Sequence, residues 1–264
     1  MLTEVKNQLK INFLSVKYAL MREMLNKTTF LMNVIFMILN NACFIVQWII
    51  LFSLKDNIGG YGLKQVLLLW GLTSTTFGIS HFFFESAYKL SDTINTGKLD
   101  AFLVQPKNVL LTAITSTISA SAIGDILYGV IIVFIYGFSV RVFLLFVLFA
   151  ITGSLILTSI AIILGSLSFW INKSDFIADT GNNLMTQFST YPDGIFKGVV
   201  KVLLYTLIPV GLTVYIPVSV IGKFNAYLFL LVIGVTVLLV SLSFLIFYKG
   251  LKRYSSSNLM VARA

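Results

Sequence analysis

Apolar runs separated by short polar segments dominate the sequence of this chain. A helix needs about 20 predominantly apolar residues to cross the roughly 30 Å hydrocarbon core of a bilayer. Runs of this length occur in five places: Phe30–Leu54, Val66–Phe84, within Val109–Phe138, Val142–Trp170 and Phe224–Tyr248. The pattern therefore predicts an all-α polytopic membrane protein.

The first 29 residues have a different periodicity. Their apolar residues recur at spacings of three and four, which places them on one stripe of a helix: Val5, Leu9, Phe13, Val16, Leu20 and Met24. Lys6, Lys10 and Lys17 lie along one edge of this stripe. The combination predicts an amphipathic helix in the membrane interface, with its lysines near lipid phosphates. A helix packed only on protein would show the same stripe.

The segment before the last run admits two interpretations. Residues 195–221 are apolar but are interrupted by Pro209 and Pro217. In the first interpretation, 195–221 is the fifth span and follows a cytoplasmic loop. In the second, Phe176–Thr190 is a short polar fifth span, and 191–222 is a proline-broken hairpin that re-enters the outer leaflet, where protein or water can cover its irregular backbone. Both interpretations predict six spans.

Composition agrees with a membrane location. Only 11% of the residues are charged and 58% are hydrophobic, whereas a soluble domain carries about 25% charged residues. The mean hydropathy is +0.94. The net charge of +9 would suggest nucleic acid in a soluble protein, but no basic cluster is interleaved with exposed aromatic residues, so no nucleic-acid partner is expected. Basic loops beside anionic lipid explain the charge better.

The basic residues also predict the orientation. They concentrate in the N-terminal segment, in residues 85–107 and after the last run, with Lys173 on the same side. Because basic loops stay inside, both termini and 85–107 are predicted to be cytoplasmic, and Lys55–Lys64 external. The first 29 residues lack the compact apolar core of a cleavable signal peptide. We expect a multi-pass protein of the plasma membrane.

The sequence offers little catalytic chemistry. It has no GxxxxGK[ST] phosphate loop, so the chain is not expected to bind or hydrolyse ATP. Its single cysteine, Cys43, excludes an intrachain disulfide and a cysteine-rich metal site. His81 and Glu85 are four residues apart and could form a proton relay, half a metal site or a simple hydrogen-bonded pair. We therefore predict no catalytic residue, no metal and no cofactor bound by this chain.

Polar residues inside the spans are the better candidates for function. Asn33, Asn40 and Gln47 recur every seven residues on the first run, so they share one helical face. This face could line a polar path or contact a neighbouring helix. Asp125 is the acidic residue within a spanning run. It could face a solvated cavity or a subunit contact, or reach water near the interface.

The polar segment 85–107 contains a recognisable pattern. The run Ile94–Asp100, followed by Leu103 and Pro106, resembles the first cytoplasmic loop of ABC-2 type permeases, of the approximate form I-x-x-G-x-L-D-x-x-L-x-x-P. It is most similar to short permeases encoded as separate subunits. Further similar features are the pairs Tyr191-Pro192, Ile208-Pro209 and Ile216-Pro217 and the basic end Lys249 to Ser256. The resemblance covers nearly the whole chain.

The resemblance implies an ABC-2 type exporter fold in a single transmembrane domain over residues 1–264. It also implies a second permease, identical or related, and two ABC ATPase subunits that bind ATP and Mg. Residues 85–107 would then be the coupling loop, with Gly97, Leu99, Asp100 and Pro106 as its characteristic residues. The family favours the second interpretation of 191–222. Its characterised members export drugs, peptides, lipids or polysaccharides.

Two other classes remain open at this point. A secondary transporter would carry buried charges and broken helices in matched halves, but Asp125 is its one good candidate and the halves do not match. A non-transporting membrane scaffold, or an intramembrane enzyme, is the other alternative. An adjacent gene for an ABC ATPase would separate these classes.

Overall fold

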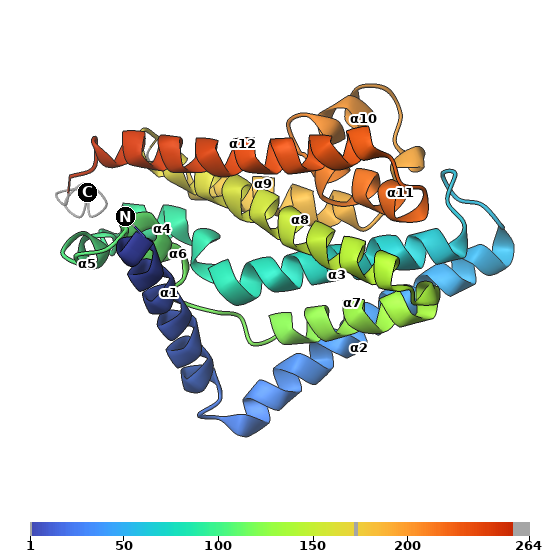
Figure 1. The fold of residues 1–264 in the computed structure, drawn as a ribbon, viewed down its shortest axis with the longest axis horizontal. Helices are drawn as coiled ribbons and strands as arrows, with labels where there is room; N and C mark the ends of the chain where they lie inside the picture. Colours follow the sequence, from blue (N-terminus) through green and yellow to red (C-terminus); the bar gives the residue numbers. More distant parts are fainter. Residues whose placement is uncertain (1, 172–173, 256–264) are drawn as a thin grey trace.

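The chain folds into a bundle of helices (Figure 1). The computed structural model describes residues 2–171 and 174–255. Lys173, Ser256 and the side chain of Val5 lie outside the described residues. The longer helices are α1 Leu2–Glu23, α2 Lys27–Leu54, α3 Leu63–Phe84, α7 Ala122–Gly137, α8 Val140–Ser166, α9 Asp175–Ser189 and α12 Ala226–Leu251.

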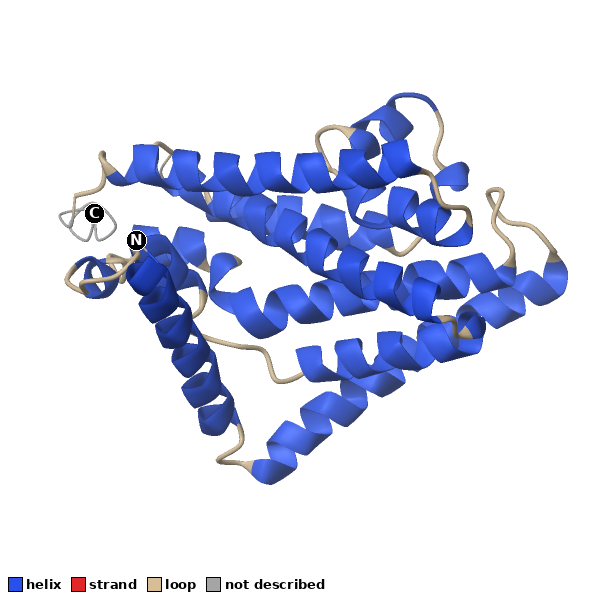
Figure 2. Cartoon of the chain, in the orientation of Figure 1, coloured by secondary structure: helices blue, strands red, loops and turns tan. Residues whose placement is uncertain are grey.

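Short helical turns connect these helices, and the regular elements of the described residues are all helical (Figure 2). The short elements are η1 Glu85–Ala87, α4 Leu90–Asn95, α5 Asp100–Leu103, α6 Val109–Ile114, η2 Leu167–Phe169, η3 Asp193–Ile195, α10 Gly198–Tyr205, the π-helical turn η4 Gly211–Tyr215 and α11 Ile216–Gly222.

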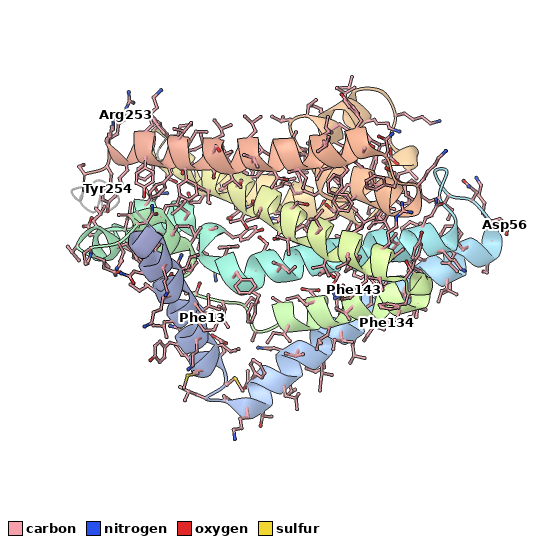
Figure 3. The ribbon with its side chains drawn as sticks, viewed as in Figure 1. Phe13, Asp56, Phe134, Phe143, Arg253 and Tyr254 are labelled. Carbon is pink, nitrogen blue, oxygen red and sulfur yellow. The ribbon has the colours of Figure 1, made fainter. Side chains whose placement is uncertain are left out.

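The bundle has two distinct ends. The start of α1, the helices α4, α5 and α6, and the end of α12 lie at one end, which we call the loop end (Figure 1). The connection between α2 and α3 lies at the other, together with α10 and α11; we call this the hairpin end. Figure 3 accordingly places Tyr254 and Arg253 at the loop end and Asp56 at the hairpin end. The termini of the described chain thus lie on the same side as residues 85–107.

Four helical runs in the described part of the chain are long and apolar enough to cross a membrane: Lys27–Leu54, Leu63–Asn95, Val140–Phe169 and Ala226–Leu251. Two shorter apolar helical segments accompany them, Ala122–Gly137 and Gly211–Gly222. The structure is therefore that of an all-α polytopic membrane protein. The number of six spans stays a prediction.

The third apolar run is not one helix. Within Val109–Phe138, α6 ends at Ile114 and α7 begins only at Ala122. Hydroxyl groups satisfy the backbone where the helix stops: Thr115 Oγ1 donates to Leu111 O at 2.8 Å, and Thr117 N donates to Ser86 Oγ at 3.0 Å. Serine and threonine side chains compete with helical hydrogen bonds in this way. The hydropathy of the run could not reveal this break.

Residues 195–221 do not form the continuous fifth span of the first interpretation. Helix α10 ends at Tyr205, and the helical path resumes at Gly211. Pro209 lies in the turn between them, and Pro217 follows the π-helical turn. Proline has no N–H group to donate and clashes with the preceding turn, which explains both interruptions. The boundaries of α9, α10 and α11 fit the second interpretation, while membrane re-entry by 191–222 stays a prediction.

Helix α1 crosses the loop end at a steep angle to the long helices (Figure 1). Its expected apolar stripe is divided between two environments. Val16 is buried beside Ile118, whereas Leu9 and Phe13 are 62% and 68% exposed. Ser15 Oγ donates to Thr115 O at 2.9 Å and ties the helix to the bundle. Its placement in a membrane interface stays a prediction.

Candidate functional site

A cavity of about 600 Å³ opens between α2, α3, α7 and α9. This volume lies within the range of small-molecule binding sites. We call it the Asp125 cavity. One part of its wall is aromatic, with Phe44, Trp70, Phe77 and Tyr191. The remainder is mostly polar: Asn40, Asn41, Thr73, Ser74, His81, Ser119, Ser121, Asp125, Thr186, Gln187 and Thr190, beside Met37 and Ala122.

Asp125 lies in the first turn of α7 and is held by two neighbouring helices. Its Oδ1 accepts a hydrogen bond of 2.6 Å from Asn41 Nδ2 on α2. Ser74 Oγ on α3 lies 3.2 Å from the same oxygen and 3.0 Å from the backbone oxygen of Asp125, and donates to one of them. The ion pairs of the described residues do not include Asp125. The carboxylate is thus oriented but has no counter-ion among these residues.

Helix α2 lines this cavity with one residue of the predicted polar face and with others beside it. Asn40 lines the cavity. Asn33 and Gln47 lie on the same stripe of the helix, beyond the cavity, and are exposed. The residue that binds Asp125 is Asn41, which is 4% exposed. Trp48, seven residues after Asn41, is also buried. This second seven-residue spacing on α2 was the sequence signal that could have identified Asn41.

A second cavity of about 290 Å³ adjoins the first. It shares His81 and Thr186 with the Asp125 cavity, and its other lining residues are Tyr88, Asp179, Asn182 and Asn183. The His81 ring stacks on Tyr88 with 4.1 Å between ring centroids. Helix α9 begins beside α4 and lines both cavities, so its polar residues extend from the loop end to the Asp125 cavity.

His81 and Glu85 each contact another residue in place of the pair considered from the sequence. Glu85 Oε1 pairs with Lys89 Nζ at 2.8 Å, and His81 Nδ1 lies 3.0 Å from Phe77 O. A carbonyl oxygen only accepts, so Nδ1 carries the proton and donates it. Within the described ranges, no group of three or more His, Cys, Asp or Glu side chains is arranged to hold a metal ion.

Residues 85–107 form a packed unit at the loop end. Ile94 and Leu99 are fully buried in an apolar cluster with α6, α8 and α12. Gly97 adopts φ of 75°, a left-handed conformation that favours glycine, and so reverses the chain between α4 and α5. Asp100 begins α5, while Val104 after it is 83% exposed and Pro106 is exposed.

The end of the described chain reaches the same unit. Tyr254 packs against this apolar cluster. Burial, and next the neighbouring Asp100 carboxylate, raise the pKa of Tyr254 above its ordinary value. Both effects disfavour the charged phenolate. The end of the described chain therefore packs beside Asp100 and the apolar cluster of residues 85–107.

A buried polar cluster connects α4 to α9. Asp175, the first residue of α9, accepts hydrogen bonds from Ser91 Oγ and, at 3.1 Å, from Asn95 Nδ2. Ser168 Oγ lies 2.6 Å from both Ser91 Oγ and Ser174 Oγ, which closes the cluster. We call this the Asp175 cluster. Residues 85–107 are thereby linked directly to a helix that lines both cavities.

A second carboxylate organises the hairpin end. Asp193, directly after Pro192, accepts 2.9 Å hydrogen bonds from Tyr61 and Tyr205 and pairs with Lys201 Nζ at 3.0 Å. Burial alone would raise the pKa of Asp193, but the bonds from Lys201, Tyr61 and Tyr205 outweigh it and hold this pKa below its usual value. These contacts fasten the hairpin to the connection between α2 and α3.

The same place contains a close backbone crossing. Gly59 has φ of 62°, and a Cβ on Gly194 would lie only 1.7 Å from Gly59 O. Only glycine at position 194 permits this approach. The residue types around Gly59 indicate a turn. Its contact with the hairpin joins residues far apart in the sequence, so no local pattern could predict it.

Comparison with known sequences gives one match. The family described as ABC-2 family transporter protein matches residues 37–258, which is most of the chain. A search of curated proteins and a search of solved structures each found no match. The matched range includes both cavities, residues 85–107 and the hairpin. The chain therefore belongs to the ABC-2 transporter family and is a membrane permease of the ABC transporter type.

Proposed function

We propose that this permease is one subunit of an exporter that is driven by two separate ATPase subunits. The packing of residues 85–107 is the observation that supports this proposal. A loop that merely joined two helices would need no buried core, yet this one places Ile94 and Leu99 in an apolar cluster. A rigid platform with an exposed tip is what a docking element for another protein requires. ATP and Mg would bind to the ATPase partner.

The tip of the platform offers apolar contacts to that partner. Val104 and Leu103 are 83% and 39% exposed and lie at the end of α5, at the loop end of the bundle. Apolar side chains at an exposed tip outside the membrane are stabilised when a partner buries them. Asp100 and Lys98 add charge beside the tip, which favours a complementary surface.

The Asp175 cluster supplies a path from this platform to the cavities. A displacement of α4 acts on Asp175 through Ser91 and Asn95. Asp175 begins α9, and α9 carries Thr186 and Gln187 into the wall of the Asp125 cavity. ATP-dependent movement of a docked ATPase could therefore change the shape of the cavity through a rigid helix.

The exposed face of α2 supports pairing with a second permease, identical or related. Asn33 and Gln47 are exposed on a helix that is long and apolar enough to span the membrane. Amide side chains in a membrane find partners across helix interfaces. The same face borders the Asp125 cavity, so the second permease would complete its wall. On α1, exposed Leu9 and Phe13 are suited to contact lipid.

These assignments define an orientation. ATP is cytoplasmic, so the loop end would face the cytoplasm, and both termini with it. The hairpin end would then face outward from the plasma membrane, and transport would run from the loop end to the hairpin end. The substrate would be a drug, a peptide or a lipid-like molecule.

Docking is tested by Val104→Asp in the full chain, expressed together with its ATPase subunit. A charge at an apolar contact should weaken association by about 2 kcal/mol, or roughly thirtyfold. We expect the ATPase to be lost from the purified permease. Gly97→Pro or Asp100→Lys should also uncouple the complex, but Gly97 shapes the platform itself, so Val104 gives the sharper test.

The matched control is Val140→Asp, which makes the same change at an exposed valine of the hairpin end. It should retain the ATPase. Asp175→Asn forms the second arm and should retain the ATPase but lose stimulation of ATP hydrolysis by substrate. Equal ATPase recovery with Val104→Asp and Val140→Asp would reject the docking assignment.

A further inference from the structure

The charge around the Asp125 cavity is one-sided. Neither cavity has a lysine or arginine among its described lining residues, whereas Asp125 and Asp179 contribute carboxylates. His81 carries its proton on Nδ1, which donates to Phe77 O, so its charge depends on the protonation of Nε2 alone. The two carboxylates therefore favour positive over negative charge in these cavities.

Asp125 also has unused binding capacity. Oδ1 accepts from Asn41, whereas Oδ2 accepts no hydrogen bond from the residues that the structure describes. A carboxylate on an apolar helix of a membrane protein is costly without a partner. Since no side-chain cation of these residues pairs with it, a positive charge from outside the chain would lower that cost.

The wall beside Asp125 suits an apolar cation. Phe44 packs edge-to-face on Trp70 with 4.8 Å between ring centroids, and Phe77 lines the same cavity. Aromatic faces attract cations, most strongly where water is excluded.

We propose that the cavity binds an amphipathic organic cation, with its positive charge at Asp125 and its apolar body against Phe44, Trp70 and Phe77. This inference rests on the proposed function, because it names the substrate class of that transporter. A volume of about 600 Å³ can hold a molecule with several aromatic rings. The polar groups from α9 would complete its contacts.

Equilibrium binding of tetraphenylphosphonium to the purified full chain in lipid nanodiscs tests the proposal. Tetraphenylborate has the same shape and the opposite charge, and triphenylphosphine oxide is neutral. We expect saturable binding of the cation only, above the level of protein-free nanodiscs. Asp125→Asn should weaken this binding at least tenfold. The matched control is Asp56→Asn, an exposed aspartate at the hairpin end (Figure 3), which should bind as the wild type does.

A second variant keeps the test valid if Asp125→Asn does not fold. Gln187 is exposed and lines the cavity, so Gln187→Lys places a competing cation at its wall with little strain. This variant should abolish binding of tetraphenylphosphonium. Gln105→Lys makes the same change at an exposed glutamine that lines neither cavity, and should preserve binding. Binding that is equal for all three probes, or unaffected by both charge variants, would overturn the proposal.

The binding assay uses no ATPase, so it separates this inference from the proposed function. A permease that recovers its ATPase but does not bind the cation would refute the substrate class alone. A permease that binds the cation but recovers no ATPase would refute the proposed function and leave the cation site standing.

Discussion

Helices α2 and α3 are both long and apolar, but they lie in opposite environments. Both belong to apolar runs long enough to span a membrane. In the apolar part of α2 only 17% of the residues are buried, whereas in the run that begins with α3 the share is 72%. Helix α3 packs against α7 and α8 and forms the centre of the fold. Helix α2 touches the bundle along one narrow stripe, which includes Val34, Asn41 and Trp48.

The difference shows that hydropathy measures the preference of a helix for a nonaqueous environment. It does not show whether lipid, the same chain or another chain provides that environment. In α3, small residues allow other helices to approach closely, and the apolar surface is covered by the same chain. In α2, the exposed face carries amides as well as apolar residues, which is a poor surface for lipid alone. Helix α3 thus specifies the fold of one chain, and in the proposed pairing of two permeases α2 would specify their association.

The largest expected effect concerns the contact between α3 and α7. A Cβ on Gly129 would lie 2.6 Å from Gly71 O and still closer to the Thr75 hydroxyl. Overpacking against backbone costs about 1–3 kcal/mol or more, which exceeds the roughly 1 kcal/mol gained by alanine in a helix. We expect Gly129→Ala to lower the thermal unfolding temperature of the purified permease by several degrees.

Gly234→Ala on α12 is the control, because a Cβ there meets no atom within 4 Å. This variant should unfold at the wild-type temperature or slightly above it. If the two variants unfold at the same temperature, the close approach of α3 and α7 does not limit stability, and the proposed division between the two helices loses its basis.

The next effect distinguishes the two faces of α2. Asn41→Leu removes the donor to Asp125 Oδ1, and a hydrogen bond to a carboxylate in this setting is worth about 1–2 kcal/mol. We expect a lower unfolding temperature. Asn33→Leu makes the same change on the exposed face, so it should leave unfolding unchanged and reduce the recovery of permease dimers. Size-exclusion chromatography measures the second effect, and a reversed pattern would exchange the roles assigned to the two faces.

Much of the architecture follows from local sequence signals. Long apolar runs predicted α2, α3, α8 and α12, because a helix that crosses a bilayer must satisfy its own backbone. Pro209 predicted the break before Gly211, since proline disrupts a helix by its covalent structure. The buried motif positions Ile94 and Leu99 form a core that the sequence alone did not distinguish from an exposed loop.

The candidate site was less predictable, because it depends on contacts between distant residues. The spacing of Asn33, Asn40 and Gln47 defined a face, but only Asn40 reaches the cavity. Asp125 was recognised as unusual, whereas its bond to Asn41 joins residues 84 positions apart. Asp175 carried no signal at all, since its partners on α4 become neighbours only through the tertiary fold.

The smallest effect concerns the connection that joins the two helices. Tyr61 in this connection donates to Asp193, whose pKa is held below its usual value of 3.8. A carboxyl with a lowered folded-state pKa contributes stability above its unfolded pKa and loses it as the pH falls through the folded value. The contribution should therefore be constant near neutral pH, begin to fall near the unfolded pKa of about 4 and be lost below the folded value.

We expect Asp193→Asn to cost about 1 kcal/mol at pH 7, mainly through the two tyrosine hydrogen bonds. Lys201 adds little, because its side chain is 45% exposed and the ion pair is screened.

The measurement is the difference in unfolding temperature between wild type and Asp193→Asn from pH 7 to pH 3. Asp56→Asn, on an exposed aspartate of the same connection, controls for general charge effects and should show no such difference. A difference that does not narrow at all between pH 5 and pH 3 would mean that the shape of the residue matters and its charge does not. The connection between α2 and α3 would then be held by packing, as at the crossing of Gly59 with Gly194.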